Sequence, residues 1–405
     1  MTTDLIYLDN AATSWPKNPR VGEAMVEFLN TKAGNPGRGG HTLSRAAGDV
    51  LEEARYKIAQ LINAPSPSRV VLTHGCTDAL NMAIHGVIRA ALRTGSDGPI
   101  RVVTSVVEHN AVLRTLHCYE MDNTIELVFV DCDEQGRVDP SRFAAACTED
   151  TALVCLTHAS NAAGTIQPIK EAAQAVRAVA PETLVLVDCA QTLGHVPVDV
   201  QSMDIDLLAI AGHKGLGGPT GTGALYLSTR AYPDNCSQDG SRVFCERRGG
   251  TGSLAPGLDM PTMLPDALEA GTSNAVGFAG LIAAMDAHDP AHHDHDMMLT
   301  KQILDGLGKI ERVTLYGTPG IDGRTPVVLF NIDGECPRMI ANTLDRKHNI
   351  ATRGGIHCAP LTHDALGIGG SGGVRVSPGH TTTSEEIDRF LEAVESISAE
   401  SPVKS

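Results

Sequence analysis

The chain has 405 residues, with 48 acidic and 32 basic side chains and a formal net charge of −16. This acidic balance, without a run of Lys or Arg, argues against binding to a nucleic-acid backbone, and aromatic residues, at 3%, are too sparse for a base-stacking platform. Hydrophobic residues make up 42% and recur along the whole length, so we expect a globular protein of two or three domains.

The N-terminus and the cysteines indicate the compartment. The first residues, M-T-T-D-L-I-Y-L-D-N, carry acid where a signal peptide needs base, and no stretch approaches the ~18 continuous apolar residues of a membrane span. Ten cysteines are scattered without a C-x-x-C pair. Such cysteines are typical of small buried side chains in a reducing compartment, so we expect nine of them to be packing residues, no disulfide framework and a cytoplasmic location.

The first two thirds of the chain predict a parallel α/β sheet. Residues 45–62 place Ala47, Leu51, Ala54 and Ile58 at the spacing of an amphipathic helix. Nearly continuous apolar runs then alternate with helical patterns, which is typical of strands buried on both faces between crossover helices. The predicted strands are 69–73, 101–105, 126–131, 152–157, 183–188, 205–210 and 222–227. The sequence leaves open whether one of the last two strands runs antiparallel to the others.

After about residue 232 the pattern breaks into Gly, Pro and polar residues, followed by a mixed set of elements. Helices are predicted near 275–288, 296–310, 337–347 and 385–397, and strands near 312–316 and 326–331. We therefore expect an α/β large domain over 1–270, with a mainly parallel seven-stranded sheet and flanking helices. A smaller C-terminal α+β domain covers 271–405, and residues 1–15 are expected to pack on it.

One segment is rich in histidine: D-A-H-D-P-A-H-H-D-H-D at 286–296 holds four. These side chains could hold a metal ion, but they crowd onto a loop and a polar helix start. We therefore interpret the segment as solvated surface and expect no metal.

Polar residues closely follow five of the predicted strands. They are H-G-C-T-D at 74–78, E-H-N at 108–110, H-A-S-N at 158–161, C-A-Q at 189–191 and G-H-K-G at 212–215. Ligands of parallel α/β sheets gather at the carboxyl ends of the strands. We therefore expect these side chains around one crevice.

Three of these positions match the needs of one cofactor. Residues 75–77 open a helix whose N–H groups favour a phosphate, Asp188 ends an apolar strand where it needs a cationic partner, and Lys214 lies where a buried amine becomes a Schiff-base nucleophile. Each alone fits equally well a plain helix cap, a buried capping aspartate or a surface lysine. Together they are what pyridoxal 5′-phosphate requires, with His109 as a ring to stack on it.

The sequence resembles the class V aminotransferase family of fold type I pyridoxal-phosphate enzymes, and within it the group II cysteine desulfurases. The resemblance spans essentially the whole chain. It is carried by Y-L-D-N-A-A-T-S-W-P-K at 7–17, V-D-C-A-Q at 187–191, A-G-H-K-G at 211–215, R-G-G-I-H-C-A-P-L at 353–361 and R-V-S-P-G-H-T-T-T at 375–383.

This resemblance implies roles around the cofactor ring. Lys214 forms the Schiff base, Asp188 faces the pyridine nitrogen, and His109 stacks on the ring and is a candidate proton shuttle. Asn161 and Gln191 contact the ring and the substrate side.

Further implied contacts concern the cofactor phosphate. Cys76, Thr77 and His213 match positions that contact it, and Thr272 matches one that reaches the phosphate of a partner subunit. The resemblance therefore implies a homodimer with shared sites. The chain differs from the family at Ala211, where Ser is a frequent phosphate ligand, and at Cys76, where Thr is frequent.

The tenth cysteine is Cys358, which follows two glycines and precedes Pro360, so we expect a flexible, exposed loop. The resemblance makes it the nucleophile that takes sulfur from the substrate as a persulfide. Arg353 and Arg375 match positions that hold the substrate carboxylate, a task that suits a guanidinium fork. We assign Arg375 to the carboxylate and Arg353 to the region near Cys358. Gly354 replaces a commonly larger residue.

The sequence therefore predicts an enzyme, a cysteine desulfurase that converts L-cysteine to L-alanine and passes sulfur from Cys358 to an acceptor, expected to be a protein. A selenocysteine lyase or a C–S lyase for cysteine derivatives is the alternative within the family. A pyridoxal-phosphate-binding scaffold without turnover is the alternative from another class, although a scaffold has no need for a reactive thiol.

Overall fold

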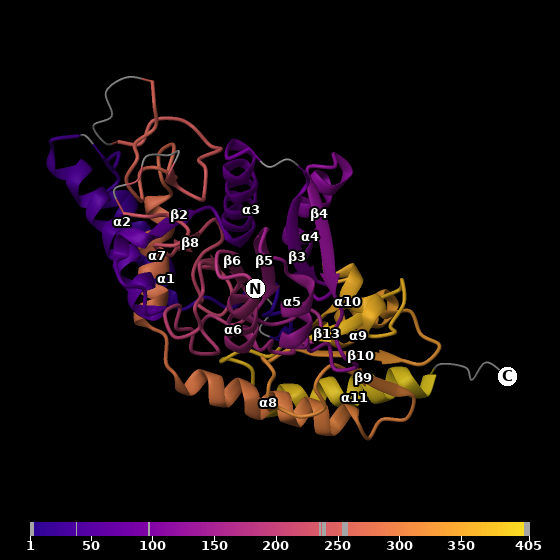
Figure 1. Cartoon of the computed structure of the whole chain (residues 1–405). Helices are drawn as coiled ribbons and strands as arrows, with labels where there is room; N and C mark the ends of the chain where they lie inside the picture. Colours follow the sequence, from indigo (N-terminus) through magenta and orange to yellow (C-terminus); the bar gives the residue numbers. More distant parts are fainter. Residues whose placement is uncertain are drawn as a thin grey trace.

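In this computed structural model the chain forms two units, each built around its own sheet (Figure 1). The structure describes residues 4–37, 39–95, 98–234, 236, 240–252 and 258–400. Within them no helix combines the length and the apolar character needed to cross a membrane.

The large unit contains a seven-stranded sheet in the order β2-β8-β7-β6-β5-β3-β4. Its strands are β2 Val70–Thr73, β3 Ile100–Ser105, β4 Ile125–Val130, β5 Thr151–Thr157, β6 Leu184–Asp188, β7 Leu207–Ala211 and β8 Gly223–Leu227. β8 is antiparallel to both of its neighbours, and the remaining pairs are parallel. The predicted fold class is confirmed, every predicted strand is present to within two residues, and the antiparallel member is β8.

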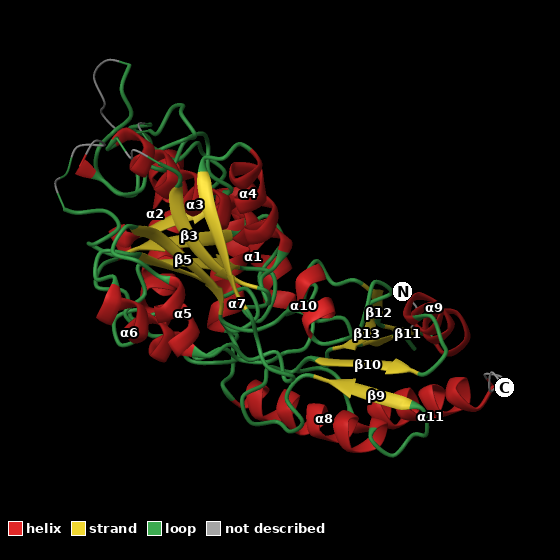
Figure 2. Ribbon diagram, turned by 45° about the vertical axis from the view of Figure 1, so that its right-hand side comes forward, coloured by secondary structure: helices red, strands yellow, loops and turns green. Residues whose placement is uncertain are grey.

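Helices cover both faces of this sheet (Figure 2). They are α1 Pro19–Thr31, α2 Thr42–Leu61, α3 Cys76–Arg93, α4 Asn110–Met121, α5 Pro140–Ala146, α6 Ile169–Val179 and α7 Ala275–Asp286. Within β2, Val70 and Leu72 join the apolar core of one face and Val71 joins that of the other. Because side chains alternate along a strand, burial on both faces makes the whole strand apolar, which is why the sequence predicts these strands well.

The small unit contains a four-stranded antiparallel sheet in the order β12-β13-β10-β9. Its elements are α8 Ala291–Leu307, β9 Val313–Tyr316, β10 Val328–Ile332, α9 Pro337–His348, β12 Arg353–Gly355, α10 Pro360–Ala365, β13 Gly373–Val376 and α11 Ser384–Glu400. Phe330 and Phe390 meet edge to face in its core, with ring centroids 6.1 Å apart. This unit is the α+β part that the sequence predicts.

The N-terminal segment crosses to the small unit. Strand β1, Ile6–Tyr7, pairs in parallel with β11, Ile350–Ala351, and Ile6 is buried in the core of the small unit. Helix α7, which follows residue 270, packs instead on α1 and α2, and Phe278 belongs to the core of the large sheet. We therefore propose that the division between the two domains follows α7.

The histidine-rich segment 286–296 spans the start of α8. Its four histidines are half-buried, and His292 stacks on His380 with ring centroids 4.5 Å apart. Five of its residues are exposed and only Asp296 is buried, so the segment lies at the surface as expected. The first turn of α8, which begins at Ala291, also packs against other parts of the fold. Within the described ranges no group of three or more His, Cys, Asp or Glu side chains is arranged to hold a metal ion.

Candidate active site

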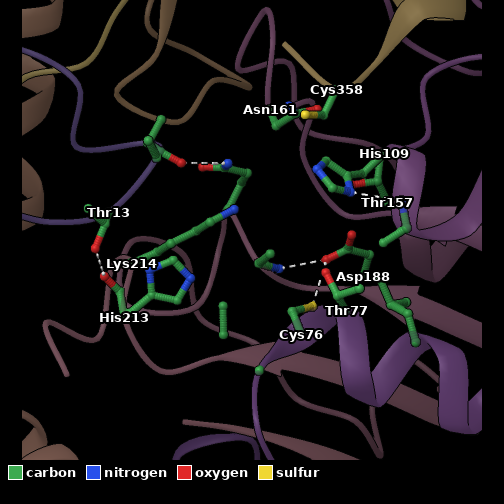
Figure 3. A pocket seen from close by; sticks show the side chains of 18 of the residues that line it. Thr13, Cys76, Thr77, His109, Thr157, Asn161, Asp188, His213, Lys214 and Cys358 are labelled. Atoms are coloured by element: carbon green, nitrogen blue, oxygen red, sulfur yellow. Dashed lines mark hydrogen bonds between the residues drawn. The ribbon is translucent and has the colours of Figure 1, made fainter. Parts of the chain in front are cut away.

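A cavity of about 890 Å³ opens at the carboxyl ends of the large sheet and is closed on one side by the small unit. Most of the residues singled out from the sequence line it (Figure 3). They are Cys76, Thr77, His109, Asn161, Asp188, Gln191, His213, Lys214, Arg353, Cys358 and Arg375. The fold thus brings together side chains that are up to 299 residues apart in the sequence, from Cys76 to Arg375.

Lys214 lies on the loop that follows β7, and its side chain reaches into the cavity (Figure 3). The loop can pass this close to its neighbours only with glycine at residue 215, because a Cβ atom there would lie 2.4 Å from the carbonyl oxygen of Leu193. Desolvation by the surrounding protein lowers the pKa of Lys214, although Asp188 acts in the opposite sense. A lowered pKa makes the neutral, nucleophilic amine easier to form.

Asp188 is the last residue of β6 and is buried at the floor of the cavity. Its Oδ1 accepts hydrogen bonds from the backbone N–H of Ala190, at 2.9 Å, and from Sγ of Cys76, at 3.3 Å. Burial, and then the charge of Asp188, raise the pKa of Cys76 well above its ordinary value, so the thiol keeps its proton and donates. Both donors use Oδ1, and no hydrogen bond to Oδ2 is found among the described residues, so Oδ2 is available to a cationic ligand.

The start of α3 is shaped to receive an anion. Gly75 precedes the helix with a φ of 151°, where glycine is favoured, and no side chain caps the first turn. Nearby, desolvation and then Lys214 lower the pKa of His213 to about 4, so its imidazole is neutral. The buried Nδ1 of His213 has no hydrogen-bond partner among the described residues.

His109 and the two amides hold neighbouring segments in place. Nδ1 of His109 accepts a hydrogen bond of 3.0 Å from the N–H of Ala111 at the start of α4, and desolvation lowers the pKa of His109. The neutral imidazole therefore carries its proton on Nε2. Asn161 donates its amide N–H to the carbonyl of His357, and Gln191 donates to the carbonyl of Ala11 at 3.0 Å.

Cys358 is exposed on a loop that the small unit contributes to the cavity. The flexibility of this loop stays a prediction, but the carbonyl of Cys358 accepts a hydrogen bond of 2.7 Å from the N–H of Asn110. The adjacent carbonyl of His357 is held by Asn161, and the hydroxyl of Thr362 donates to the carbonyl of Val106 at 3.3 Å. The small unit therefore presents the thiol on a loop that is tied to the large unit.

The two arginines share one carboxylate that the sequence alone did not single out. Nη2 of Arg375 donates to Oδ1 of Asp9 at 2.7 Å, and Nε and Nη2 of Arg353 donate to Oδ2 at 3.0 and 2.9 Å. Arg375 also donates to the carbonyl of Asn161 at 2.8 Å. Asp9 lies within the quoted motif at 7–17, but no local pattern connects it to arginines so far along the chain.

Known proteins share both the sequence pattern and the fold of this chain. A model of the aminotransferase class-V family matches residues 6–390. The chain belongs to this family.

Relatives of this chain in the aminotransferase class-V family are named cysteine desulfurase or probable cysteine desulfurase. A protein named probable cysteine desulfurase from Methanothermobacter thermautotrophicus is 35% identical over 403 residues, which is 97% of this chain and 95% of that protein. Cysteine desulfurase IscS of Vibrio cholerae is 32% identical over 417 residues, 98% of this chain and 95% of the relative. The solved apo structure of cysteine desulfurase from Thermococcus onnurineus NA1 matches with a TM-score of 0.88 and 31% identity, covering 98% of this chain and 95% of that one.

One residue that was assigned through the resemblance to this aminotransferase family lies outside the cavity around Lys214. Thr272 is exposed and lines a separate cavity, where its hydroxyl donates to Oδ1 of Asn35 at 3.5 Å. It is not among the described residues that line the cavity of its own chain around Lys214.

The cysteine assignment also needs a correction. Cys118 and Cys336 are exposed, so they are not the buried packing residues expected from the scattered pattern. Their exposure could not be predicted from the sequence. Each lies on a helix or at a helix start, and tertiary packing decides which face of that helix is exposed.

Glu108 is a buried residue next to the site, and sequence reasoning did not single it out. Its Oε1 accepts hydrogen bonds from Oγ of Ser105, at 2.5 Å, and from the N–H of Thr157, at 2.9 Å. It thereby ties the end of β3 to the end of β5, directly beside His109. Desolvation raises the pKa of Glu108 to about 8. In the sequence, the segment E-H-N at 108–110 indicated only His109 as a site residue.

Proposed function

We propose that the chain is a pyridoxal-phosphate-dependent cysteine desulfurase that converts L-cysteine to L-alanine and takes the sulfur onto Cys358 as a persulfide. The observation that carries this proposal is that Lys214, Asp188 and Cys358 face one cavity although Cys358 comes from the small unit. The names of the full-length relatives support it.

The residues of the cavity fit the cofactor. The open Oδ2 of Asp188 suits a protonated ring nitrogen, and the uncapped start of α3 together with the unpartnered Nδ1 of His213 suits a phosphate. Lys214 would hold the cofactor covalently, with His109 against its ring. When bound, pyridoxal phosphate supplies an electron sink for the α-carbon of an amino acid.

Three side chains of the cavity would bind the substrate and transfer protons. Arg375 binds the substrate carboxylate, and Lys214, with its lowered pKa, takes the proton from the α-carbon and returns a proton later. His109, neutral and protonated on Nε2, is placed to hold or pass a proton on the other side of the cavity (Figure 3).

Cys358 performs the sulfur transfer. Its thiolate attacks the sulfur of the bound substrate, so that an S–S bond forms as the carbon–sulfur bond breaks. The electron pair of the broken bond passes to the substrate carbon, which takes up a proton and leaves as alanine. Because Cys358 is exposed, the persulfide can be passed to an acceptor, which we propose is a protein.

We also propose a homodimer with shared sites in a reducing, cytoplasmic compartment. The exposed position of Thr272 outside the cavity of its own chain supports the dimer, since a partner subunit could reach it there. The ten free cysteines support the compartment.

Replacement of Lys214 tests the proposed function. In Lys214→Ala we expect alanine release from L-cysteine to fall by at least about 10³-fold, because both the covalent hold on the cofactor and the proton transfer are lost. Alanine is measured in the reaction mixture, and the cofactor by its absorbance. The exposed Lys170 on α6 supplies the control, since Lys170→Ala should match wild type. Wild-type alanine release from Lys214→Ala would refute the proposal.

A further inference from the structure

The carbonyl oxygen of His213, the residue directly before Lys214, accepts four hydrogen bonds. The backbone N–H and the hydroxyl of Ser14 donate to it at 3.2 and 3.3 Å. The hydroxyl of Thr13 donates at 3.1 Å (Figure 3), and Nζ of Lys17 forms the shortest bond, at 2.8 Å. Since a carbonyl oxygen has two lone pairs, four donors around it mark a point of the backbone that the fold holds tightly.

The loop around Lys214 has few side chains of its own that could hold it. Between residues 212 and 218, only His213 and Leu216 carry a side chain besides Lys214, because the other four residues are glycine. Contacts from outside the loop must therefore help to fix the backbone from which the Lys214 side chain extends. The carbonyl of His213 is where such contacts gather.

Lys17 differs from the other donors because it brings a charge. Its Nζ also donates to the hydroxyl of Ser14 at 2.8 Å, and its side chain is half-buried. Desolvation lowers the pKa of Lys17 to about 8, so the amine is mainly protonated at pH 7. A hydrogen bond from a charged donor is roughly twice as strong as one between neutral groups, so Lys17 contributes most to the hold on this carbonyl.

Lys17 reaches the loop from outside the candidate active site. It lines a small separate cavity of about 70 Å³, which Lys214 also lines, and it is not among the described residues around the larger cavity. Earlier in the same segment, Nδ2 of Asn10 donates to the carbonyl of Ser377 at 3.1 Å, which anchors the segment to the small unit. Lys17 is therefore placed to act on Lys214 through the backbone and not on a ligand.

We propose that Lys17 is a positioning residue for Lys214: its ammonium group holds the carbonyl of His213 and so fixes the point from which the Lys214 side chain enters the cavity. The inference rests on the proposed function, in which Lys214 holds the cofactor and transfers the proton of the α-carbon. The charge of Lys17 is the feature that carries this role, since Thr13 and Ser14 offer neutral donors to the same carbonyl.

Three substitutions separate the charge of Lys17 from its bulk. Lys17→Met removes the charge and the donor, Lys17→Gln keeps a neutral donor group, and Lys17→Arg keeps both. In Lys17→Met we expect kcat for L-cysteine to fall about tenfold with the KM changed less than about threefold, because the proton transfer at Lys214 is disturbed while Arg375 is untouched. The fall should be smaller in Lys17→Gln, and Lys17→Arg should stay within about threefold of wild type.

Two readouts on the holoenzyme do not depend on turnover. Visible circular dichroism of the cofactor reports how its ring is held, and absorbance during dialysis reports how fast the cofactor is lost. In Lys17→Met the dichroic band should weaken and the cofactor should be lost severalfold faster, whereas the far-ultraviolet spectrum should match wild type. Lys17→Gln takes its place if Lys17→Met does not fold. The control is Lys301→Met, which removes an exposed lysine paired with Asp305 on α8 and should match wild type throughout.

Three outcomes would overturn the inference. One is a wild-type kcat and dichroic band in Lys17→Met. Another is an equal loss in Lys17→Met and Lys17→Arg, which would mean that the charge plays no part. The third is a rise in the KM with kcat unchanged, which would place Lys17 in substrate binding. If wild type releases no alanine from L-cysteine but Lys17→Met loses its cofactor faster and Lys17→Arg does not, the proposed function is refuted and the positioning role stands.

Discussion

At the scale of single residues, the site was predictable where a motif and a strand end coincide. Asp188 directly ends an apolar run and Lys214 lies between glycines after the next one, so both could be assigned from the sequence. Asp9 could not, because its partners Arg353 and Arg375 lie 344 and 366 residues away. Only tertiary structure shows that its carboxylate is shared.

Glu108 gives the folded protein a pH dependence of its own. The pKa of its carboxyl is raised from 4.5 to about 8, first by desolvation. Below the lower value the carboxyl is neutral in both states. Between the two values the unfolded chain loses the proton while the folded protein keeps it, so stability falls as the pH rises through this window.

Glu108→Gln should remove this loss, since the amide keeps the shape of the side chain and does not ionise. Relative to wild type, the variant should gain stability from about pH 5 to about pH 8, by a few kcal/mol at most. Thermal unfolding at several pH values measures the effect. Glu53→Gln on the exposed side of α2 is the control. If the unfolding temperatures of wild type and Glu108→Gln change in parallel from about pH 5 to about pH 8, the account is contradicted.

At the scale of elements, the strands of the large sheet were predictable and the loop of Cys358 was not. Burial on both faces makes a strand such as β6 a continuous apolar run, which the sequence displays. The loop sequence predicts flexibility because of its glycines. The contacts of its carbonyls with Asn110 and Asn161 depend on the docking of the two units, which has no local signal.

Gly354 shows why the segment before Cys358 needs a glycine. A Cβ atom at this position in β12 would lie 2.3 Å from the carbonyl oxygen of Pro337 and 2.9 Å from Cα of Arg338. Both atoms belong to the backbone of α9 and cannot turn aside as a side chain can.

Gly354→Ala should lower stability by about 1–3 kcal/mol, because α9 must shift to make room. It should also slow alanine release, since β12 carries Arg353 and leads to Cys358. Gly22 on the exposed face of α1 is the matched control: a Cβ atom there meets no neighbour within 4 Å, and Gly22→Ala should stabilise by about 0.5–1 kcal/mol. If chemical denaturation finds Gly354→Ala as stable as wild type, the packing argument is wrong.

At the scale of the whole molecule, the site exists because the two units meet. The large unit supplies Lys214 and Asp188, and the small unit supplies Cys358 and both arginines. The net charge of −16 hides this concentration of cationic side chains in one cavity. Composition therefore argues against a nucleic-acid ligand, but it does not reveal the group of cationic side chains in this cavity.

The central claim is that sulfur leaves L-cysteine by way of Cys358, and peptide mass analysis tests it most directly. Holoenzyme is incubated with L-cysteine, alkylated and digested, and alanine is measured in the same sample. We expect one added sulfur atom on the peptide that contains Cys358, and we expect alanine to be formed in the same sample. Cys336→Ala, which removes another exposed thiol, should leave both unchanged, whereas Cys358→Ala should keep the cofactor absorbance and lose both the added sulfur and sulfide release. Undiminished sulfide release from Cys358→Ala, without sulfur on this peptide in wild type, would contradict the account and favour a C–S lyase that needs no cysteine.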